Sequence, residues 1–106
     1  MAKVPSTLSQ YIVPGKVNIF SITNCPFCVK AKDLFTTLKV DFSTHEVDTN
    51  ENFKNNKEFI ASLNEFCKIK TYPKIVIGET CVGGFSDLDK IYRNMKLFTM
   101  LKKEGI

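Results

Sequence analysis

The chain of 106 residues contains no tryptophan, a single histidine and no long apolar run. Because a helix needs ~20 apolar residues to cross a bilayer, we expect no membrane-spanning segment. The N-terminus, Met1-Ala2-Lys3-Val4-Pro5-Ser6, also lacks the apolar core of a secretory signal. Four cysteines without an export signal predict a reducing, cytoplasmic location, in which thiols are catalytic or spare rather than structural.

Charge and length narrow the class of protein further. The formal net charge is +4, but the lysines are scattered and no basic cluster interleaves with aromatic residues, so we expect no nucleic-acid partner. A chain of this length can bury a hydrophobic core without disulfides or structural metal ions. It contains no repeat, linker or low-complexity segment. We therefore expect one domain over residues 1–106, acting as a monomer away from membranes.

The most informative stretch is Asn24-Cys25-Pro26-Phe27-Cys28. A predicted strand precedes it and a predicted helix follows it, so Cys25 should lie at the helix N-terminus with Cys28 one turn further on. Pro26 suits the first helical position, where a missing N–H costs nothing. Unpaired N–H groups and the positive end of the helix dipole favour a thiolate at such a place. This position indicates redox chemistry.

A C-x-x-C pair can also be half of a zinc site, or two inert buried thiols. Zinc would need two more ligands, and only His45, Cys67 and Cys81 remain, each singly placed. We therefore expect no metal. We interpret His45 as an ordinary strand histidine rather than a catalytic base, and Cys67 as a buried residue. Cys81 is predicted to be a spare thiol, with regulation by oxidation as the alternative.

Hydrophobic periodicity predicts elements in the order α-β-α-β-α-β-β-α. The predicted helices cover residues 5–13, the thiol motif to Leu38, about 51–67, and about 87–103. The predicted strands cover 16–22, 41–47, 75–77 (opened by Pro73) and 81–82. The apolar residues expected to face the core include Phe27, Ala31, Leu34, Phe35, Leu38, Phe53, Met95 and Phe98.

This order of elements restricts the topology. A strand–helix–strand unit requires a parallel pair with a right-handed crossover. The closely spaced strands at 75–77 and 81–82 require an antiparallel hairpin. Both conditions are met by an α/β fold: a three-layer α/β/α sandwich with a four-stranded mixed sheet flanked by helices.

Three motifs in sequence order resemble the dithiol glutaredoxins, a family with a thioredoxin-like fold. They are Cys25-Pro26-Phe27-Cys28, Thr71-Tyr72-Pro73 and Gly83-Gly84-Phe85-Ser86-Asp87, and the resemblance extends from Pro14-Gly15-Lys16 to the last residue. It implies a glutathione-dependent thiol–disulfide oxidoreductase with glutathione as reducing co-substrate. Its partners would be glutathionylated or disulfide-containing proteins.

The resemblance also implies roles for individual residues. Cys25 would be the nucleophile and Cys28 the resolving thiol. A cis peptide would precede Pro73, and the backbone of Tyr72 would bind the cysteinyl part of glutathione. The remaining implied binding residues are Phe27, Thr71, Gly84, Ser86 and Asp87, the last two holding the γ-glutamyl end.

Simpler interpretations of these motifs stand beside the functional ones. Ser86, with Asp89 three residues later, resembles a capping box that would only start a helix. Pro73 could merely open a strand, and the Gly83-Gly84 pair could merely turn the chain. Capping and binding can coexist, because a helix N-terminus that needs a cap also accepts an anionic ligand.

The sequence departs from the family pattern at Ile22, where a lysine is usual, and at Tyr72, where valine is usual. The valine change is tolerable because the implied contact uses backbone atoms. The missing lysine removes a charge-assisted hydrogen bond to a glutathione carboxylate, worth about 1.5–3 kcal/mol. Lys70 is the best substitute donor. Phe27 replaces a frequent tyrosine and keeps an aromatic wall.

Two other functions remain open at this stage. An iron–sulfur carrier would share a cluster between two chains through Cys25 and bound glutathione, although Pro26 argues against it. A thioredoxin-type reductant would instead draw electrons from a flavoprotein reductase. The tryptophan usual beside the C-x-x-C pair of thioredoxin is absent.

Overall fold

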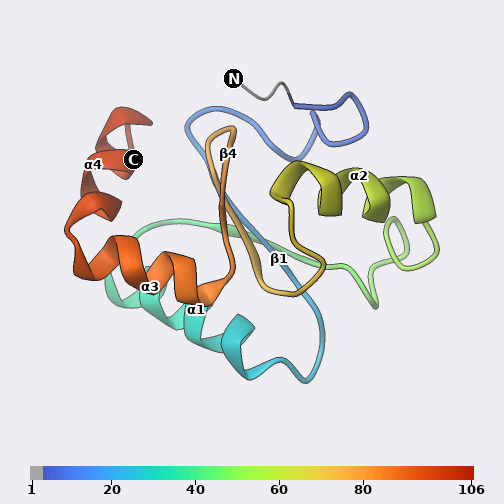
Figure 1. Ribbon diagram of the computed structural model, residues 1–106, viewed down its shortest axis with the longest axis horizontal. Coiled ribbons are helices and arrows are strands. Elements are labelled where there is room, and N and C mark those ends of the chain that lie inside the picture. The colour runs from blue at the N-terminus through green and yellow to red at the C-terminus, as the bar shows by residue number, and fades with distance from the viewer. Residues whose placement is uncertain (1–3) are drawn as a thin grey trace.

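The computed structural model describes residues 4–106 (Figure 1). Its elements are β1 (Val17–Ser21), α1 (Pro26–Thr37), β2 (Ser43–Glu46), α2 (Lys57–Cys67), β3 (Lys74–Ile77), β4 (Thr80–Gly83), α3 (Phe85–Arg93) and α4 (Lys96–Lys103). The strands form one sheet in the order β2-β1-β3-β4, with β1 parallel to β2 and antiparallel to β3, and β3 antiparallel to β4. The expected four-stranded mixed sheet is confirmed. In the described part of the chain, every helix is too short or too polar to span a membrane.

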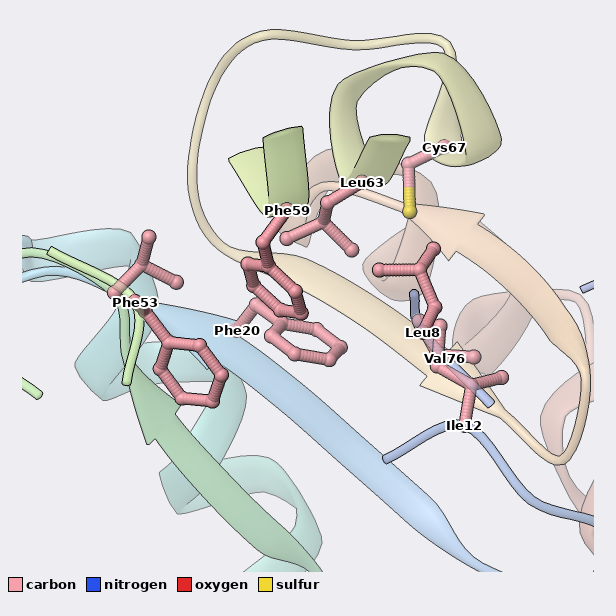
Figure 2. Close-up of a cluster of buried hydrophobic side chains, with 9 residues drawn as sticks. Leu8, Ile12, Phe20, Phe53, Phe59, Leu63, Cys67 and Val76 are labelled. Carbon is pink, nitrogen blue, oxygen red and sulfur yellow. The ribbon is translucent and has the colours of Figure 1, made fainter. Parts of the chain in front are cut away.

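Alternation along β1 and β3 divides the core into two clusters, because successive strand side chains point to opposite faces. The α2-face cluster (Figure 2) comprises Leu8, Ile12, Phe20, Val47, Phe53, Phe59, Leu63, Cys67 and Val76. The α1-face cluster comprises Val17, Ile19, Ala31, Phe35, Ile75, Ile77, Leu88, Leu97 and Leu101. Helices therefore cover both faces of the sheet, α2 on one and α1, α3 and α4 on the other, as the sequence predicts.

The prediction of an N-terminal helix over residues 5–13 is wrong. The segment forms consecutive turns instead, in which the backbone N–H groups of Tyr11 and Ile12 both donate to the carbonyl of Leu8 at 2.9 Å. A segment this short gains too few hydrogen bonds to sustain a helix, and Pro14 stops its extension. Its apolar side chains are nevertheless buried in the α2-face cluster, Leu8 with 0% and Ile12 with 1% of its surface exposed.

Helix α2 begins later than the predicted residue 51. The Asn56 side chain accepts from the N–H of Phe59 at 3.0 Å and serves as the N-cap. Ahead of it, the Asn50 side chain accepts from the N–H of Asn52 at 2.8 Å and stabilises a turn. Asparagine side chains compete with the helix for backbone groups in this way. Phe53 is buried as predicted, but from that turn.

The single helix predicted over 87–103 is divided into α3 and α4. Met95 adopts a left-handed backbone, with φ of 63°, which a right-handed helix cannot contain. The change of direction lets α4 bury Leu97 and Leu101 in the α1-face cluster. Met95 and Phe98, which were expected in the core, are 69% and 44% exposed, so that prediction is wrong.

The C-terminal segment closes one end of the sheet. The N–H of Gly15, just before β1, donates to Oε1 of Glu104 at 2.8 Å. Gly78, which follows β3, has φ of 61°, and a Cβ at this position would overlap the Glu104 carboxylate. Because Cys25 follows the other end of β1, Glu104 lies at the end of the sheet remote from the thiol motif.

All four cysteines are in disulfides, Cys25 with Cys28 and Cys67 with Cys81. Cys67 is 9% exposed, so its predicted burial is confirmed. The prediction that Cys81 is a spare thiol is wrong, because the end of α2 packs onto β4 and brings the two sulfurs into bonding contact. No sequence spacing indicated this pair.

The buried N-terminal segment should stabilise the fold although it is not helical. We expect Leu8→Ala to lower the free energy of unfolding by about 2–5 kcal/mol, because it removes a fully buried side chain and leaves a cavity. Urea denaturation followed by circular dichroism measures the change. Gln10→Ala, at an exposed position of the same segment, is the control. Equal stability of the two variants would show that the segment does not pack on the core.

Candidate active site

Cys25 is the N-cap of α1, as its predicted place at the helix start requires. Its backbone is extended, and its Sγ accepts from the N–H of Cys28 at 3.2 Å. Pro26 occupies the first helical position. Cys25 is half-buried, whereas Cys28 is only 1% exposed. The sulfur that reagents can reach is therefore the one that receives the helix N–H.

A carboxylate from the next parallel strand fixes the turn before Cys25. Asp48 accepts from the Thr23 N–H at 3.0 and 3.2 Å and from its hydroxyl at 2.6 Å. These bonds favour the charged form and lower the pKa of Asp48. Sequence reasoning assigned Asp48 no role beside the thiol motif, so this contact was missed. Its position just after β2 was the available signal, because parallel strands β1 and β2 end at the same edge.

The second motif lies beside the accessible sulfur. The Tyr72–Pro73 peptide is cis, as the family resemblance implies. The carbonyl oxygen of Tyr72 lies 3.7 Å from Cys25 Sγ. Within residues 4–106, neither the N–H nor the C=O of Tyr72 forms a backbone–backbone hydrogen bond. This leaves a backbone edge to which an extended peptide can add by strand-like pairing.

The third motif packs against the second. A Cβ at Gly84 would lie 3.6 Å from the carbonyl oxygen of Pro73, so the two segments lie close together. Asp87, in the first turn of α3, accepts from the Gly84 N–H at 3.1 Å. Gly83 has φ of 119°, and a Cβ there would overlap the Asp87 carboxylate. The N-terminus of α3 is thereby held next to the cis-proline loop.

The predicted capping box between Ser86 and Asp89 is wrong. The cap is formed two residues earlier, where the Gly84 N–H donates to the Asp87 carboxylate. Asp89 instead pairs with Arg93 at 2.8 Å along the exposed side of α3. Gly84 has the extended backbone of an N-cap residue, and its N–H is directed toward Asp87. Ser86 is exposed at the start of the helix.

Phe27 is part of the surface around the thiols rather than of the core. It is 55% exposed, which contradicts the core position expected from helical spacing. In the first turn of α1, its side chain lies beyond the sheet and stacks on Phe85, with ring centroids 6.1 Å apart. Lys30 Nζ lies 5.1 Å from the centroid of the Phe27 ring. The first and third motifs are thus joined through an aromatic contact.

The two departures from the family pattern have different surroundings. Ile22, where lysine is usual, is partly buried and packs on the α2-face cluster. Lys70, the proposed substitute, is exposed on the loop before β3, as is Thr71. The structure therefore leaves Lys70 free to move toward a ligand docked along Tyr72.

Lys74 is a buried cation that sequence reasoning missed. It is 0% exposed, its Nζ donates to the carbonyl of Thr71 at 3.0 Å, and it lies 3.6 Å from the centroid of the Tyr72 ring. Burial lowers the pKa of Lys74 to about 8. Tyr72, in place of valine, supplies the aromatic face that this ammonium contacts. The available signal was strand alternation, which puts Lys74 on the same face as buried Val76.

His45 has a structural environment, in agreement with its interpretation as an ordinary strand histidine. Its Nε2 lies 2.9 Å from Oδ1 of Asn18, and its ring stacks on Phe20 at 4.9 Å. Burial lowers the pKa of His45. In residues 4–106, no three His, Cys, Asp or Glu side chains are grouped as a metal site would require.

The chain is similar to known proteins in sequence. A family model described as Glutaredoxin matches residues 17–82. A protein named Glutaredoxin from Solanum lycopersicum is 37% identical over 98 residues, which are 92% of this chain and 88% of that protein. Glutaredoxin-1 from Homo sapiens is 31% identical over 94 residues, which are 89% of each chain.

Solved structures show the same architecture. The crystal structure of wheat glutaredoxin has a TM-score of 0.81 at 30% identity, and the match covers 98% of this chain and 100% of that one. The crystal structure of the buckwheat glutaredoxin–glutathione complex has a TM-score of 0.75 at 29% identity. That match covers 84% of this chain and 78% of the buckwheat chain.

The buried ammonium of Lys74 should make stability rise with pH. Because its pKa is about 8 in the folded protein and about 10.4 in an exposed lysine, only the unfolded chain keeps the proton between those values. We expect the free energy of unfolding of the wild type, relative to Lys74→Met, to rise by about 2 kcal/mol from pH ~7.5 to ~9.5. Urea denaturation at the two pH values gives the difference.

Lys70→Met is the matched control for this measurement, because Lys70 lies in the same loop but is exposed. It should follow the pH dependence of the wild type. The interpretation of Lys74 is wrong if Lys74→Met shows the same rise with pH as the wild type does.

Proposed function

Because the chain belongs to the glutaredoxin family, we propose that Cys25 and Cys28 carry out its glutathione-dependent thiol–disulfide exchange. The fold is the thioredoxin-like α/β/α sandwich of that family, and the activity is that of an oxidoreductase with glutathione as reducing co-substrate. One observation supports the assignment to these residues most strongly. The accessible sulfur, at a helix start, lies 3.7 Å from the carbonyl oxygen of Tyr72, which has no backbone hydrogen-bond partner in residues 4–106.

In the reaction of a mixed disulfide, the Cys25 thiolate attacks the glutathione sulfur of a glutathionylated protein. The protein thiolate leaves and takes up a proton, and Cys25 becomes glutathionylated. A second glutathione thiolate attacks the glutathione sulfur of this intermediate, releasing glutathione disulfide and the Cys25 thiolate. Cys28, buried beneath, takes no part in these two exchanges.

A protein disulfide requires the second thiol. Cys25 attacks one sulfur of the substrate and forms a mixed disulfide with it. Cys28 then attacks Cys25 Sγ, the reduced substrate leaves as a dithiol, and the Cys25–Cys28 disulfide remains. Two glutathione molecules reduce that disulfide and are oxidised to glutathione disulfide.

The helix N-terminus mainly assists the departure of Cys25. The N–H of Cys28, 3.2 Å from Cys25 Sγ, stabilises the thiolate and so increases its population. A stabilised thiolate is also a weaker nucleophile, so the attack step gains little. As a leaving group, however, a stabilised thiolate departs faster. The opening of glutathionylated Cys25 should therefore benefit more than its formation.

Glutathione docks along the rim formed by the second and third motifs. Its cysteinyl part pairs with the N–H and C=O of Tyr72, which have no backbone partner in residues 4–106. The γ-glutamyl carboxylate lies at the N-terminus of α3, beside Ser86, where unpaired N–H groups favour an anion. Asp87 pairs with the adjacent ammonium, and exposed Lys70 with the glycyl carboxylate. Phe27, Thr71, Pro73 and Gly84 complete the surface.

The partners of this reaction are glutathionylated proteins and protein disulfides, and we place the enzyme in the cytoplasm as a monomer. A pool of reduced glutathione is what the second half-reaction consumes, and such a pool is typical of that compartment. Among the contacts of residues 4–106, none favours the iron–sulfur alternative.

The two classes of substrate should require different thiols. We expect Cys28→Ser to retain glutathione-dependent reduction of a small glutathione mixed disulfide and to lose reduction of an intramolecular protein disulfide. Cys25→Ser should lose both activities, because it removes the attacking atom. Coupled spectrophotometric assays with both substrates measure the rates. Activity of Cys25→Ser with either substrate would end the proposal.

The negative charge of Asp87 should affect the KM for glutathione but not the stability of the helix cap. Asp87→Asn keeps an oxygen that can accept from the Gly84 N–H but loses the negative charge. We expect its KM for glutathione to rise about tenfold, since a charge-assisted hydrogen bond is worth about 1.5–3 kcal/mol, while the thermal midpoint changes little. Steady-state kinetics and thermal denaturation together test this.

Asp89→Asn is the matched control, because Asp89 is two residues along α3 and pairs with Arg93 instead. Its KM for glutathione should equal that of the wild type. If both variants raise KM equally, the effect comes from net charge and Asp87 has no specific role.

A further inference from the structure

The disulfide between Cys67 and Cys81 is separate from the catalytic pair. It joins the last residue of α2 to β4, with Cα atoms 5.3 Å apart and a sequence separation of 14. Both residues contact the α2-face cluster, whereas α1, which carries Cys28, packs on the other face of the sheet (Figure 1). The helices that carry Cys28 and Cys67 therefore cover opposite faces of the sheet, and we treat this disulfide as separate from the Cys25–Cys28 cycle.

The chain segment enclosed by this bond contains the glutathione-docking edge. The loop that carries Thr71, Tyr72 and Pro73 begins directly after Cys67. Tyr72 itself packs on the same α2-face cluster as both cysteines. Cys81 is followed two residues later by the Gly83-Gly84 pair, and Gly84 lies close to the carbonyl of Pro73. Both parts of the docking rim are thus directly connected to the disulfide.

The far end of the loop is held independently. Lys74 is fully buried at the start of β3, and its Nζ donates to the carbonyl of Thr71. When the disulfide is closed, the loop is fastened at Cys67 by a covalent bond and at Lys74 by burial. When it is open, only packing holds the Cys67 end, and the loop gains freedom that glutathione binding must remove.

We propose that Cys67 and Cys81 are a second redox pair, whose closure fixes the docking loop and raises the affinity of the enzyme for glutathione. This inference rests on the proposed function, since it concerns the same docking edge. The sensed condition is the ratio of glutathione to glutathione disulfide. An oxidised pool would then increase the affinity for the reductant of the catalytic cycle.

Closure needs only glutathione disulfide as oxidant. The Cys81 thiolate, partly exposed, attacks one sulfur of glutathione disulfide and releases one glutathione thiolate. The Cys67 thiolate then attacks Cys81 Sγ of the mixed disulfide and releases the second. Two cysteine thiols are oxidised to one disulfide, one glutathione disulfide is reduced to two glutathione molecules, and the two thiol protons pass to the two glutathione thiolates.

Opening should be slow compared with the catalytic cycle. An incoming glutathione thiolate can reach Cys81, and the group that must leave is then Cys67, which is 9% exposed among apolar side chains. Apolar surroundings disfavour a thiolate, and a poorly stabilised thiolate leaves slowly. Cys25 has the opposite situation, at a helix N-terminus. The second pair therefore keeps its state through many turnovers.

Trypsin places the two disulfides in different peptides, so the redox state of each can be measured in the wild-type protein. The Cys25–Cys28 bond lies within the peptide 17–30, whereas the Cys67–Cys81 bond joins the peptides 58–68 and 75–90. The enzyme is equilibrated in buffers of increasing glutathione to glutathione disulfide ratio, quenched with acid, alkylated and digested. Mass spectrometry should show the cross-linked pair in oxidising buffers and both alkylated peptides in reducing ones.

The functional consequence is measured on the same preparations. Enzyme taken from the oxidising and the reducing buffers is diluted into an assay with a small glutathione mixed disulfide, and initial rates are recorded at several glutathione concentrations. We expect KM for glutathione to be roughly two- to tenfold lower with the second pair closed, and kcat to be unchanged. The Cys67→Ser/Cys81→Ser variant should have the higher KM whatever its previous buffer.

Several results would overturn the proposal. They are absence of the cross-linked peptides in every buffer, persistence of the cross-link in the most reducing buffer, and equal KM for the open and closed wild type. The wild-type comparison needs no folded variant, so it decides the matter even if the double substitution destabilises the protein. Loss of glutathione-dependent activity in both states, with the cross-link still reversible, would contradict the proposed function instead.

Discussion

The hydrogen bond from the Cys28 N–H to Cys25 Sγ is the contact on which the site depends. It exists because a short turn leads from β1 into α1 and because Cys25, not a serine or aspartate, occupies the N-cap. The same contact both selects the accessible sulfur and stabilises its negative charge. The hydrogen bonds from Thr23 to the Asp48 carboxylate hold the preceding turn and so keep this start of the helix in place.

The binding that we propose around that sulfur relies mainly on backbone groups. In the proposed docking mode, glutathione contacts the N–H and C=O of Tyr72 and the N-terminus of α3. Backbone groups remain when a side chain changes, which explains why tyrosine can stand in the usual place of valine. The tyrosine ring contacts the buried ammonium of Lys74, so tyrosine at this position also has a structural role.

Sequence reasoning predicted the sheet, the helices on both its faces and the place of Cys25, because these follow from apolar periodicity and from the local chemistry of a helix start. It failed where several local solutions compete. Asn50 and Asn56 offer alternative caps, so the start of α2 was misplaced. The left-handed residue between α3 and α4 is Met95 rather than a glycine, so the sequence carried no signal for a break. The two helices were therefore predicted as one.

The contacts that were missed at the site are of another kind. Lys74, Asp48 and the Cys67–Cys81 bond each join segments far apart in the chain, or depend on burial on a particular face. One sequence shows which side chains are present, but not which loops meet. The family resemblance supplied the Tyr72–Pro73 and Ser86-Asp87 positions, whereas residues peculiar to this chain became visible only in three dimensions.

Glu104 holds the C-terminal segment at the end of the sheet opposite to Cys25. Its carboxylate accepts from the Gly15 N–H and lies against Gly78, at the end of the sheet remote from Cys25. The last residues therefore point away from the reactive rim. Linking the protein to an electrode or a reporter through a C-terminal cysteine-free tether would leave the sulfur facing solution, and electron flow through it could be followed on a surface.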